Sequence, residues 1–249
     1  MARLGAIEEI KIRRTELTVA GRRLAMTAGT VVGNRYPANF DVLHLDDGRP
    51  LVVVADGMGA GEGSRVAGRT TVDVFVGMAA PRPGPLRAAD AEAQRRLREA
   101  GHRLGELTGC TLTAFVGDDH DAWLVQIGDS RAYRLRDGQL ELLTVDHTAA
   151  WLGAVNGWYP FDSPRAHADR YRLMRYVGHP DQPEPDVLNV TLRPGDVYLL
   201  CTDGLAEQVP YGRIAEVLTR DGNPVGTLLA ESLRAGGNDN ATGAVIAVH

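Results

Sequence analysis

Residues 51–63 read Leu-Val-Val-Val-Ala-Asp-Gly-Met-Gly-Ala-Gly-Glu-Gly. The five apolar residues that open this stretch predict a fully buried strand. The strand runs directly into Asp56 and a cluster of glycines, where the backbone can turn sharply and approach a ligand closely. A carboxylate at the end of a buried strand, beside bare backbone, suits a hard metal ion or a phosphate. The alternative is an Asp-Gly turn that closes an ordinary strand, and the stretch alone does not decide between the two.

The composition is that of an ordinary globular chain and excludes several function classes. The 249 residues are 44% hydrophobic and 24% charged, and the formal net charge of −5 argues against a nucleic-acid-binding module. No apolar run approaches the roughly 20 residues that a membrane span needs, and the N-terminus lacks the apolar core of a signal peptide. Cys110 and Cys201 sit inside apolar runs, as small buried hydrophobes do. We therefore expect a cytoplasmic monomer, and the preference for Arg over Lys, with Lys11 the single lysine, indicates a GC-rich bacterial genome.

The N-terminal half predicts strands followed by two helices. Alternating apolar and polar positions within 7–32, interrupted by a turn at 20–23, indicate a pair of strands. A loop over 33–41 leads to a strand at 42–45 and a hairpin turn at 46–48, before the buried strand. We expect a first helix over 64–80 that ends at the prolines of 81–85, and a second over 88–107.

The C-terminal half predicts strands, a long loop and two short helices. The expected strands are 111–116, 122–127, 132–136, 140–143, 197–202 and 241–248, and the expected helices are 211–220 and 224–235. Residues 146–190 predict an irregular segment, and a loop this long usually has a function. No internal repeat or linker divides the chain, so we expect one α+β domain over residues 1–249.

Acidic residues recur at the ends of the predicted strands. An apolar strand runs into Asp-Gly at Asp56 and again at Asp203, while Asp41, Asp129 and Asp239 also lie at or beside strand edges. Several carboxylates that converge on one place repel each other unless a cation neutralises them. A set of oxygen ligands suits Mg²⁺ or Mn²⁺ rather than zinc, and two such ions can activate a water and orient a phosphate.

Other catalytic motifs find no support in the sequence. It contains no nucleophile elbow, no phosphate-binding loop with Gly-Lys-Ser/Thr, no dinucleotide fingerprint after a strand and no Cys or His pair at zinc spacing. His147 is the most suggestive histidine, and we interpret it as a surface or hydrogen-bonded structural residue rather than a ligand.

Five ordered segments resemble the PP2C (PPM) family of metal-dependent Ser/Thr protein phosphatases, most closely its compact bacterial branch. They are Val54-Ala55-Asp56-Gly57-Met58-Gly59, Gly128-Asp129-Ser130-Arg131-Ala132-Tyr133, Thr144-Val145-Asp146-His147-Thr148, Gly195-Asp196 with Leu200-Cys201-Thr202-Asp203-Gly204-Leu205, and Gly237-Asn238-Asp239-Asn240-Ala241-Thr242. The resemblance runs from about residue 24 to the C-terminus. It implies a four-layer αββα sandwich of two antiparallel sheets flanked by helices, with the metal centre at one end.

The resemblance also implies a role for each matching residue. Asp56 bridges two Mn²⁺ or Mg²⁺ ions, and the Gly57 carbonyl adds a ligand to the second ion. Asp203 and Asp239 complete the shell of the first ion, Asp41 holds metal-bound water, and Asp129 contributes to a third, weakly bound metal. Arg35 is the candidate ligand of the substrate phosphate, and residues of about 146–178 form a flap that bears on substrate choice. The expected catalytic set is thus Asp56, Asp203, Asp239 and Arg35.

Three residues depart from the family pattern. Phe40 stands where the family usually has an acid, so the second metal site is expected to be weaker or filled by water. Arg35 lies one residue further from Asp41 than usual, and Met58 stands where animal members have a proposed general-acid histidine.

The activity implied is removal of phosphate from phosphoserine or phosphothreonine in proteins, by a water that the two metal ions activate. Two alternatives stay open at this point. The aromatic-rich flap would suit a phosphatase of a small phosphorylated metabolite on the same scaffold. Phe40 would suit a catalytically weak regulatory or binding module.

Overall fold

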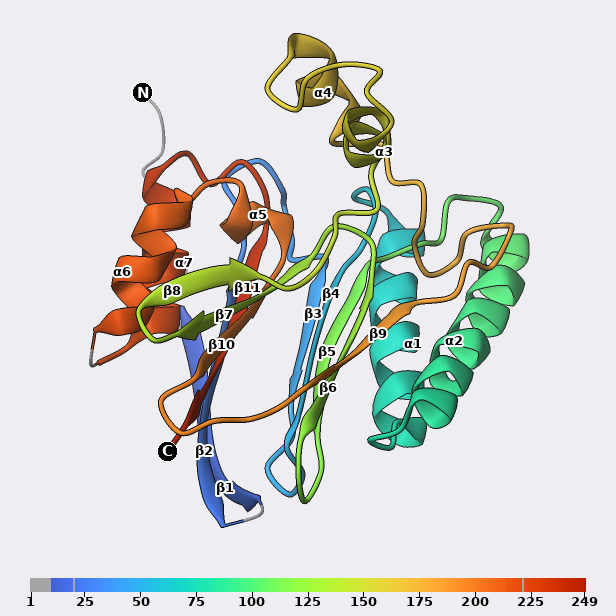
Figure 1. Ribbon diagram of the computed structural model, residues 1–249. Coiled ribbons are helices and arrows are strands. Elements are labelled where there is room, and N and C mark those ends of the chain that lie inside the picture. Colours follow the sequence, from blue (N-terminus) through green and yellow to red (C-terminus); the bar gives the residue numbers. More distant parts are fainter. Residues whose placement is uncertain (1–9, 20, 221) are drawn as a thin grey trace.

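Two antiparallel sheets packed face to face form the centre of the molecule, with helices on both outer faces (Figure 1). This computed structural model describes residues 10–19, 21–220 and 222–249. The expected four-layer αββα sandwich is therefore confirmed.

The first sheet has six strands in the order β1-β2-β11-β10-β7-β8. Their bounds are β1 Lys11–Val19, β2 Arg22–Val31, β7 Arg131–Arg136, β8 Gln139–Leu142, β10 Val197–Cys201 and β11 Ala241–Val248. The helices α6 (Tyr211–Thr219) and α7 (Pro224–Arg234) cover its outer face with their apolar sides (Figure 1). The short helix α5 (Asp203–Ala206) follows β10 directly.

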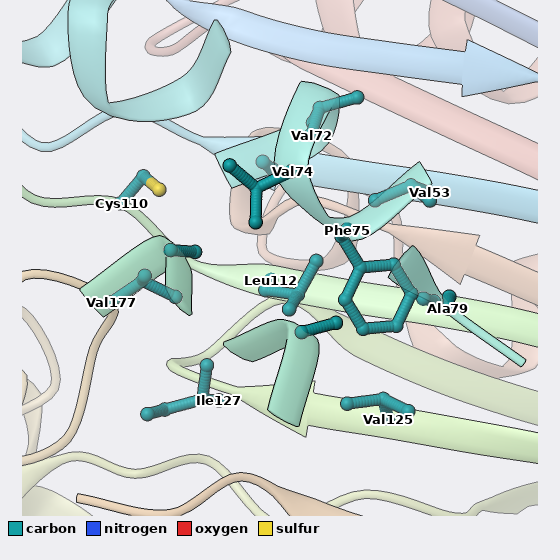
Figure 2. Packing of buried hydrophobic residues seen from close by; sticks show 14 of the residues in the cluster. Val53, Val72, Val74, Phe75, Ala79, Cys110, Leu112, Val125, Ile127 and Val177 are labelled. Carbon is teal, nitrogen blue, oxygen red and sulfur yellow. The ribbon is translucent and has the colours of Figure 1, made fainter. Parts of the chain in front are cut away.

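The second sheet has five strands in the order β3-β4-β5-β6-β9. They are β3 Asp41–Leu45, β4 Leu51–Asp56, β5 Leu112–Gly117, β6 Ala122–Ile127 and β9 Asp186–Val190. Its outer face is covered by α1 (Glu62–Met78) and α2 (Pro83–Leu104). Figure 2 shows Phe75 of α1 packed with Val53, Leu112 and Val125 of the sheet.

The buried strand expected at 51–55 is β4, and all five of its apolar residues are buried. Alternate residues of β4 serve two cores because a strand points successive side chains to opposite faces. Val53 packs toward the helices, whereas Val52 and Val54 pack between the two sheets. This double burial holds Asp56, at the end of β4, on a rigid element.

Two predictions about local structure were wrong. The first helix ends before the prolines of 81–85 as expected, since α1 ends at Met78, but the second helix does not wait until residue 88. It begins at Pro83, because proline is tolerated in the first turn of a helix. The segment 146–190 is also more regular than expected, since it contains α3 (Ala149–Val155), α4 (Pro164–Asp169) and the strand β9. Thr148 and Ser163 cap these two helices with their side chains, and such caps were the available sequence signal. Figure 1 shows α3 and α4 at one end of the sandwich, above the strand ends.

Candidate metal centre

Four of the predicted acids line one pocket of about 220 Å³ at the end of the sandwich. Asp56 comes from the end of β4, Asp129 from the turn between β6 and β7, Asp203 from the start of α5, and Asp239 from the loop before β11. The two sheets therefore both contribute, since β4 and β10 belong to different sheets. Gly57 also lines this pocket.

The backbone beside Asp56 is held close to its neighbours. Asp56 N–H donates to the Thr111 hydroxyl at 2.9 Å, and a Cβ on Gly57 would lie 2.4 Å from Ser64 Oγ. Only glycine fits at position 57, so the packing keeps the main chain bare beside the pocket. The same reasoning applies to Gly204, where a Cβ would lie 1.9 Å from the Asn240 carbonyl oxygen.

The carboxylates raise the pKa of one another. Burial, followed by the charges of Asp41, Asp203 and Asp129, raises the pKa of Asp56 well above its usual value. Burial, followed by the charge of Asp239, raises the pKa of Asp203 to about 6. Burial raises the pKa of Asp129 and of Asp239 as well. Bringing these acids together therefore costs free energy that a bound cation would offset.

The donor set fits hard divalent ions. The pocket offers carboxylate oxygens, and Asp203 Oδ1 is buried without a hydrogen-bond partner among the described residues. Within 10–19, 21–220 and 222–249, no three His, Cys, Asp or Glu side chains lie close enough together to hold a metal ion by themselves. Mg²⁺ and similar ions usually take only one or two carboxylates and keep several waters, so separate carboxylates along an open pocket suit them.

Asp41 does not line this pocket. It lies in register with Asp56 across the β3–β4 pair and is only 8% exposed. Its Oδ2 accepts hydrogen bonds from the hydroxyls of Thr202 at 2.9 Å and Thr242 at 2.6 Å. Burial raises the pKa of Asp41 to about 7. Among the neighbouring charges, that of Asp41 raises the pKa of Asp56 most. Asp41 is thus behind Asp56, in contact with the strand ends of the other sheet.

Arg35 and Phe40 lie on the side of the pocket formed by the loop before β3. Arg35 is exposed and does not line the pocket, although its charge acts on Asp239. Phe40 is 4% exposed and lines the pocket together with Tyr36, whose ring it meets edge-on at 6.1 Å between centroids. The side of the pocket at Phe40 is thus an apolar wall.

Residues outside the predicted set hold the Asp129 turn in place. His147 Nδ1 accepts a hydrogen bond from Gly128 N–H at 3.1 Å, and the His147 N–H donates to the Gly128 carbonyl at 2.9 Å. Arg131 makes a bidentate ion pair with Asp146, at 2.9 and 2.6 Å. His147 is therefore a buried and hydrogen-bonded structural residue, one of the two roles expected for it.

A second pocket of about 200 Å³ lies beneath α3 and α4 and shares Asp129 and Asp203 with the first. Glu207 lines it, and burial raises the pKa of this carboxyl. Sequence analysis did not single out Glu207. The available signal was its position four residues after Asp203, at the C-cap of α5, which brings the two side chains to one side of this helical turn.

Comparison with known proteins places the chain among bacterial phosphatases. The profile of the family described as Protein phosphatase 2C matches residues 39–236. The serine/threonine protein phosphatase PstP of Mycobacterium tuberculosis is 33% identical over 205 residues, which are 78% of this chain but 40% of PstP. Protein phosphatase PhpP of Streptococcus pneumoniae is 28% identical over 235 residues, covering 88% of this chain and 96% of PhpP.

Solved structures give the same result. The catalytic domain of PstP in complex with two manganese ions has a TM-score of 0.80 at 30% identity, and covers 91% of this chain and 99% of that domain. PppA of Pseudomonas aeruginosa, described as a regulatory component of a type VI secretion system, has a TM-score of 0.82 at 28% identity and covers 94% of this chain.

Among the described residues, no helix is long and apolar enough to cross a membrane.

Proposed function

Since the chain belongs to the protein phosphatase 2C family, we propose that it is a single phosphatase domain that removes phosphate from phosphoserine and phosphothreonine in bacterial proteins. The observation that carries this proposal is the convergence of Asp56, Asp129, Asp203 and Asp239 from both sheets on one pocket. Cys110 and Cys201 are free and buried, as is usual for proteins of the reducing cytoplasm, and we place the protein there. We take the working form to be a monomer.

The residues of the pocket divide into those that hold cations and those that face the substrate. Asp56, the Gly57 carbonyl, Asp203 and Asp239 would hold two Mn²⁺ or Mg²⁺ ions, and Asp129 would serve a third. When bound, the ions supply a water of lowered pKa and positive charge opposite the phosphoryl oxygens.

Two further side chains of the loop before β3, Tyr36 in the pocket wall and Arg35 outside it, would contact the substrate phosphate. The charge of Asp239 and partial burial raise the pKa of Tyr36, so its phenol remains a hydrogen-bond donor at neutral pH. Arg35, exposed beside it, would bind phosphoryl oxygens through its planar fork.

The test is the loss of activity in Asp203→Asn and Asp239→Asn. Each variant should retain its circular dichroism spectrum and lose about 100-fold or more of Mn²⁺-dependent aryl phosphate hydrolysis, because a carboxylate ligand becomes a neutral amide. Asp73→Asn, the same change at an exposed position of α1, is the matched control. Undiminished turnover in both variants would overturn the proposed function.

Substrate class is tested by comparing phosphopeptides with small phosphorylated metabolites. A protein phosphatase should show the higher kcat/KM on a phosphothreonine peptide. A higher value on the small phosphates would favour the metabolite phosphatase instead.

A further inference from the structure

A basic groove lies on the far side of Phe40 from the candidate metal centre. It has a volume of about 330 Å³, and four cationic side chains line it: Lys11, Arg13, Arg65 and Arg69. Phe40 borders both this groove and the carboxylate pocket, so the two are neighbours separated by one side chain. The groove contrasts with the chain as a whole, whose net charge is −5.

One wall of the groove comes from the edge strand β1. Odd-numbered residues of β1 point toward the other sheet, and Leu17 and Val19 pack between the sheets in this way. Lys11 and Arg13 are on the same face, nearer the N-terminal end of the strand. They lie in register with Thr30 and Ala28 of β2, which also line the groove. Lys11 and Arg13 therefore lie on the same face of β1 as Leu17 and Val19, but they carry charge where those two residues pack in the hydrophobic core.

The opposite wall comes from the first turns of α1. Arg65 and Arg69 are four residues apart, so they lie on one face of the helix. The Arg65 guanidinium lies 5.8 Å from the centroid of the Phe40 ring, which directs it toward the boundary between groove and pocket. Between the walls runs β3, the edge strand of the second sheet, which pairs with β4 alone.

The positive charge of the groove is largely uncompensated. Arg13 pairs with Asp47 at 2.9 Å, and both partners are exposed. Among the described residues, Lys11, Arg65 and Arg69 make no ion pair. Asp41 is the acid in the wall, and it is buried against Thr202 and Thr242. A row of cations beside an open strand edge suits an extended, acidic polypeptide.

We infer that this groove binds an acidic segment of the phosphoprotein substrate while the phosphorylated residue occupies the carboxylate pocket. The inference rests on the proposed function and specifies its substrate class: phosphoproteins whose phosphorylated residue lies close to acidic residues.

The experiment compares two phosphothreonine peptides of equal length, one with several Glu beside the phosphothreonine and one with Gln at the same positions. The wild type should show about tenfold higher kcat/KM on the acidic peptide, mostly through KM, and the preference should shrink at high salt. The variant Lys11→Gln/Arg69→Gln should lose most of the preference.

The matched control is Arg14→Gln/Arg98→Gln, which removes the same charge from exposed positions outside the groove, and it should keep the preference. Equal kcat/KM on the two peptides in the wild type, or an equal loss in both double variants, would overturn the inference. Turnover of an aryl phosphate by the wild type separates the two proposals. If the wild type hydrolyses the aryl phosphate but shows equal kcat/KM on the two peptides, only the groove inference fails. If the wild type does not hydrolyse the aryl phosphate, the proposed function fails.

Discussion

Phe40 is the residue that separates the carboxylate pocket from the basic groove. Its ring closes one side of the carboxylate pocket, meets Tyr36 edge-on and lies beneath the Arg65 guanidinium. A phenyl ring cannot bind a cation such as Mn²⁺ through oxygen, so the cations would have one carboxylate fewer on this side. The same ring gives the basic groove an apolar boundary.

Replacing Phe40 by Glu should tighten Mn²⁺ binding about tenfold, because a carboxylate would be added beside Asp56 and Asp239. Calorimetric titration with Mn²⁺ measures this, and Phe40→Leu, which keeps the wall apolar, should leave the affinity near that of the wild type. A folded Phe40→Glu variant with unchanged or weaker affinity would contradict the prediction.

At the scale of elements, α2 carries a buried acid that the metal centre does not use. Asp90 is 2% exposed, and its Oδ1 has no hydrogen-bond partner among the described residues. Burial raises its pKa to about 7, and the nearby Gln94 and Arg175 offset only part of this effect. The folded state therefore holds a proton on Asp90 that the unfolded chain releases near pH 4.

The sign of the resulting pH dependence follows from this difference. A raised pKa in the folded state contributes stability at low pH, and this contribution is lost as the pH rises to about 7. Asp90→Asn removes the titration. The free energy of unfolding of Asp90→Asn relative to the wild type should therefore rise between about pH 4 and pH 7, by about 2–4 kcal/mol.

Urea unfolding at several pH values measures this difference. Asp73→Asn, an exposed substitution on α1, should show no such trend. A difference between Asp90→Asn and the wild type that does not change with pH would show that Asp90 titrates normally.

At the scale of the whole molecule, the packing of the two sheets creates the candidate site. Asp56 belongs to one sheet, whereas Asp203 and Asp239 flank strands of the other. Burial raises the pKa of Asp41 to about 7, and burial followed by the charge of Asp239 raises that of Asp203 to about 6.

Mn²⁺ should therefore stabilise the fold, and more strongly as the pH rises. A concentration of about 100 times Kd adds about 2.7 kcal/mol, which raises Tm by roughly 5–10 °C. Below about pH 6 the carboxyl groups with raised pKa hold protons that compete with the cation, so the Tm increase should shrink.

Thermal unfolding with Mn²⁺ or with a chelator at about pH 5.5 and pH 8 tests this prediction. The double variant Asp203→Asn/Asp239→Asn should show no Mn²⁺-dependent increase in Tm at either pH. An increase in the wild type that is equal at both pH values would contradict the assigned protonation.

Local patterns in the sequence were sufficient for most of the elements. The buried strand β4, the strand β6 and the apolar run of β11 depend on residues adjacent in the chain, so they could be predicted within a residue or two. The start of α2 at Pro83 and the short helices α3 and α4 were missed. In those segments the outcome depends on caps and on contacts with distant residues rather than on periodicity.

The sequence by itself determined the two Asp-Gly strand ends, the oxygen-only set of candidate ligands and the family to which the chain belongs. Only the tertiary structure decided that Asp41 lies behind the pocket, held by Thr202 and Thr242, while Phe40 forms its wall. It alone brought Lys11 and Arg69 to one groove. The physical reason is that strand ends and charges have local sequence signals, whereas the distance between two side chains depends on how the sheets pack.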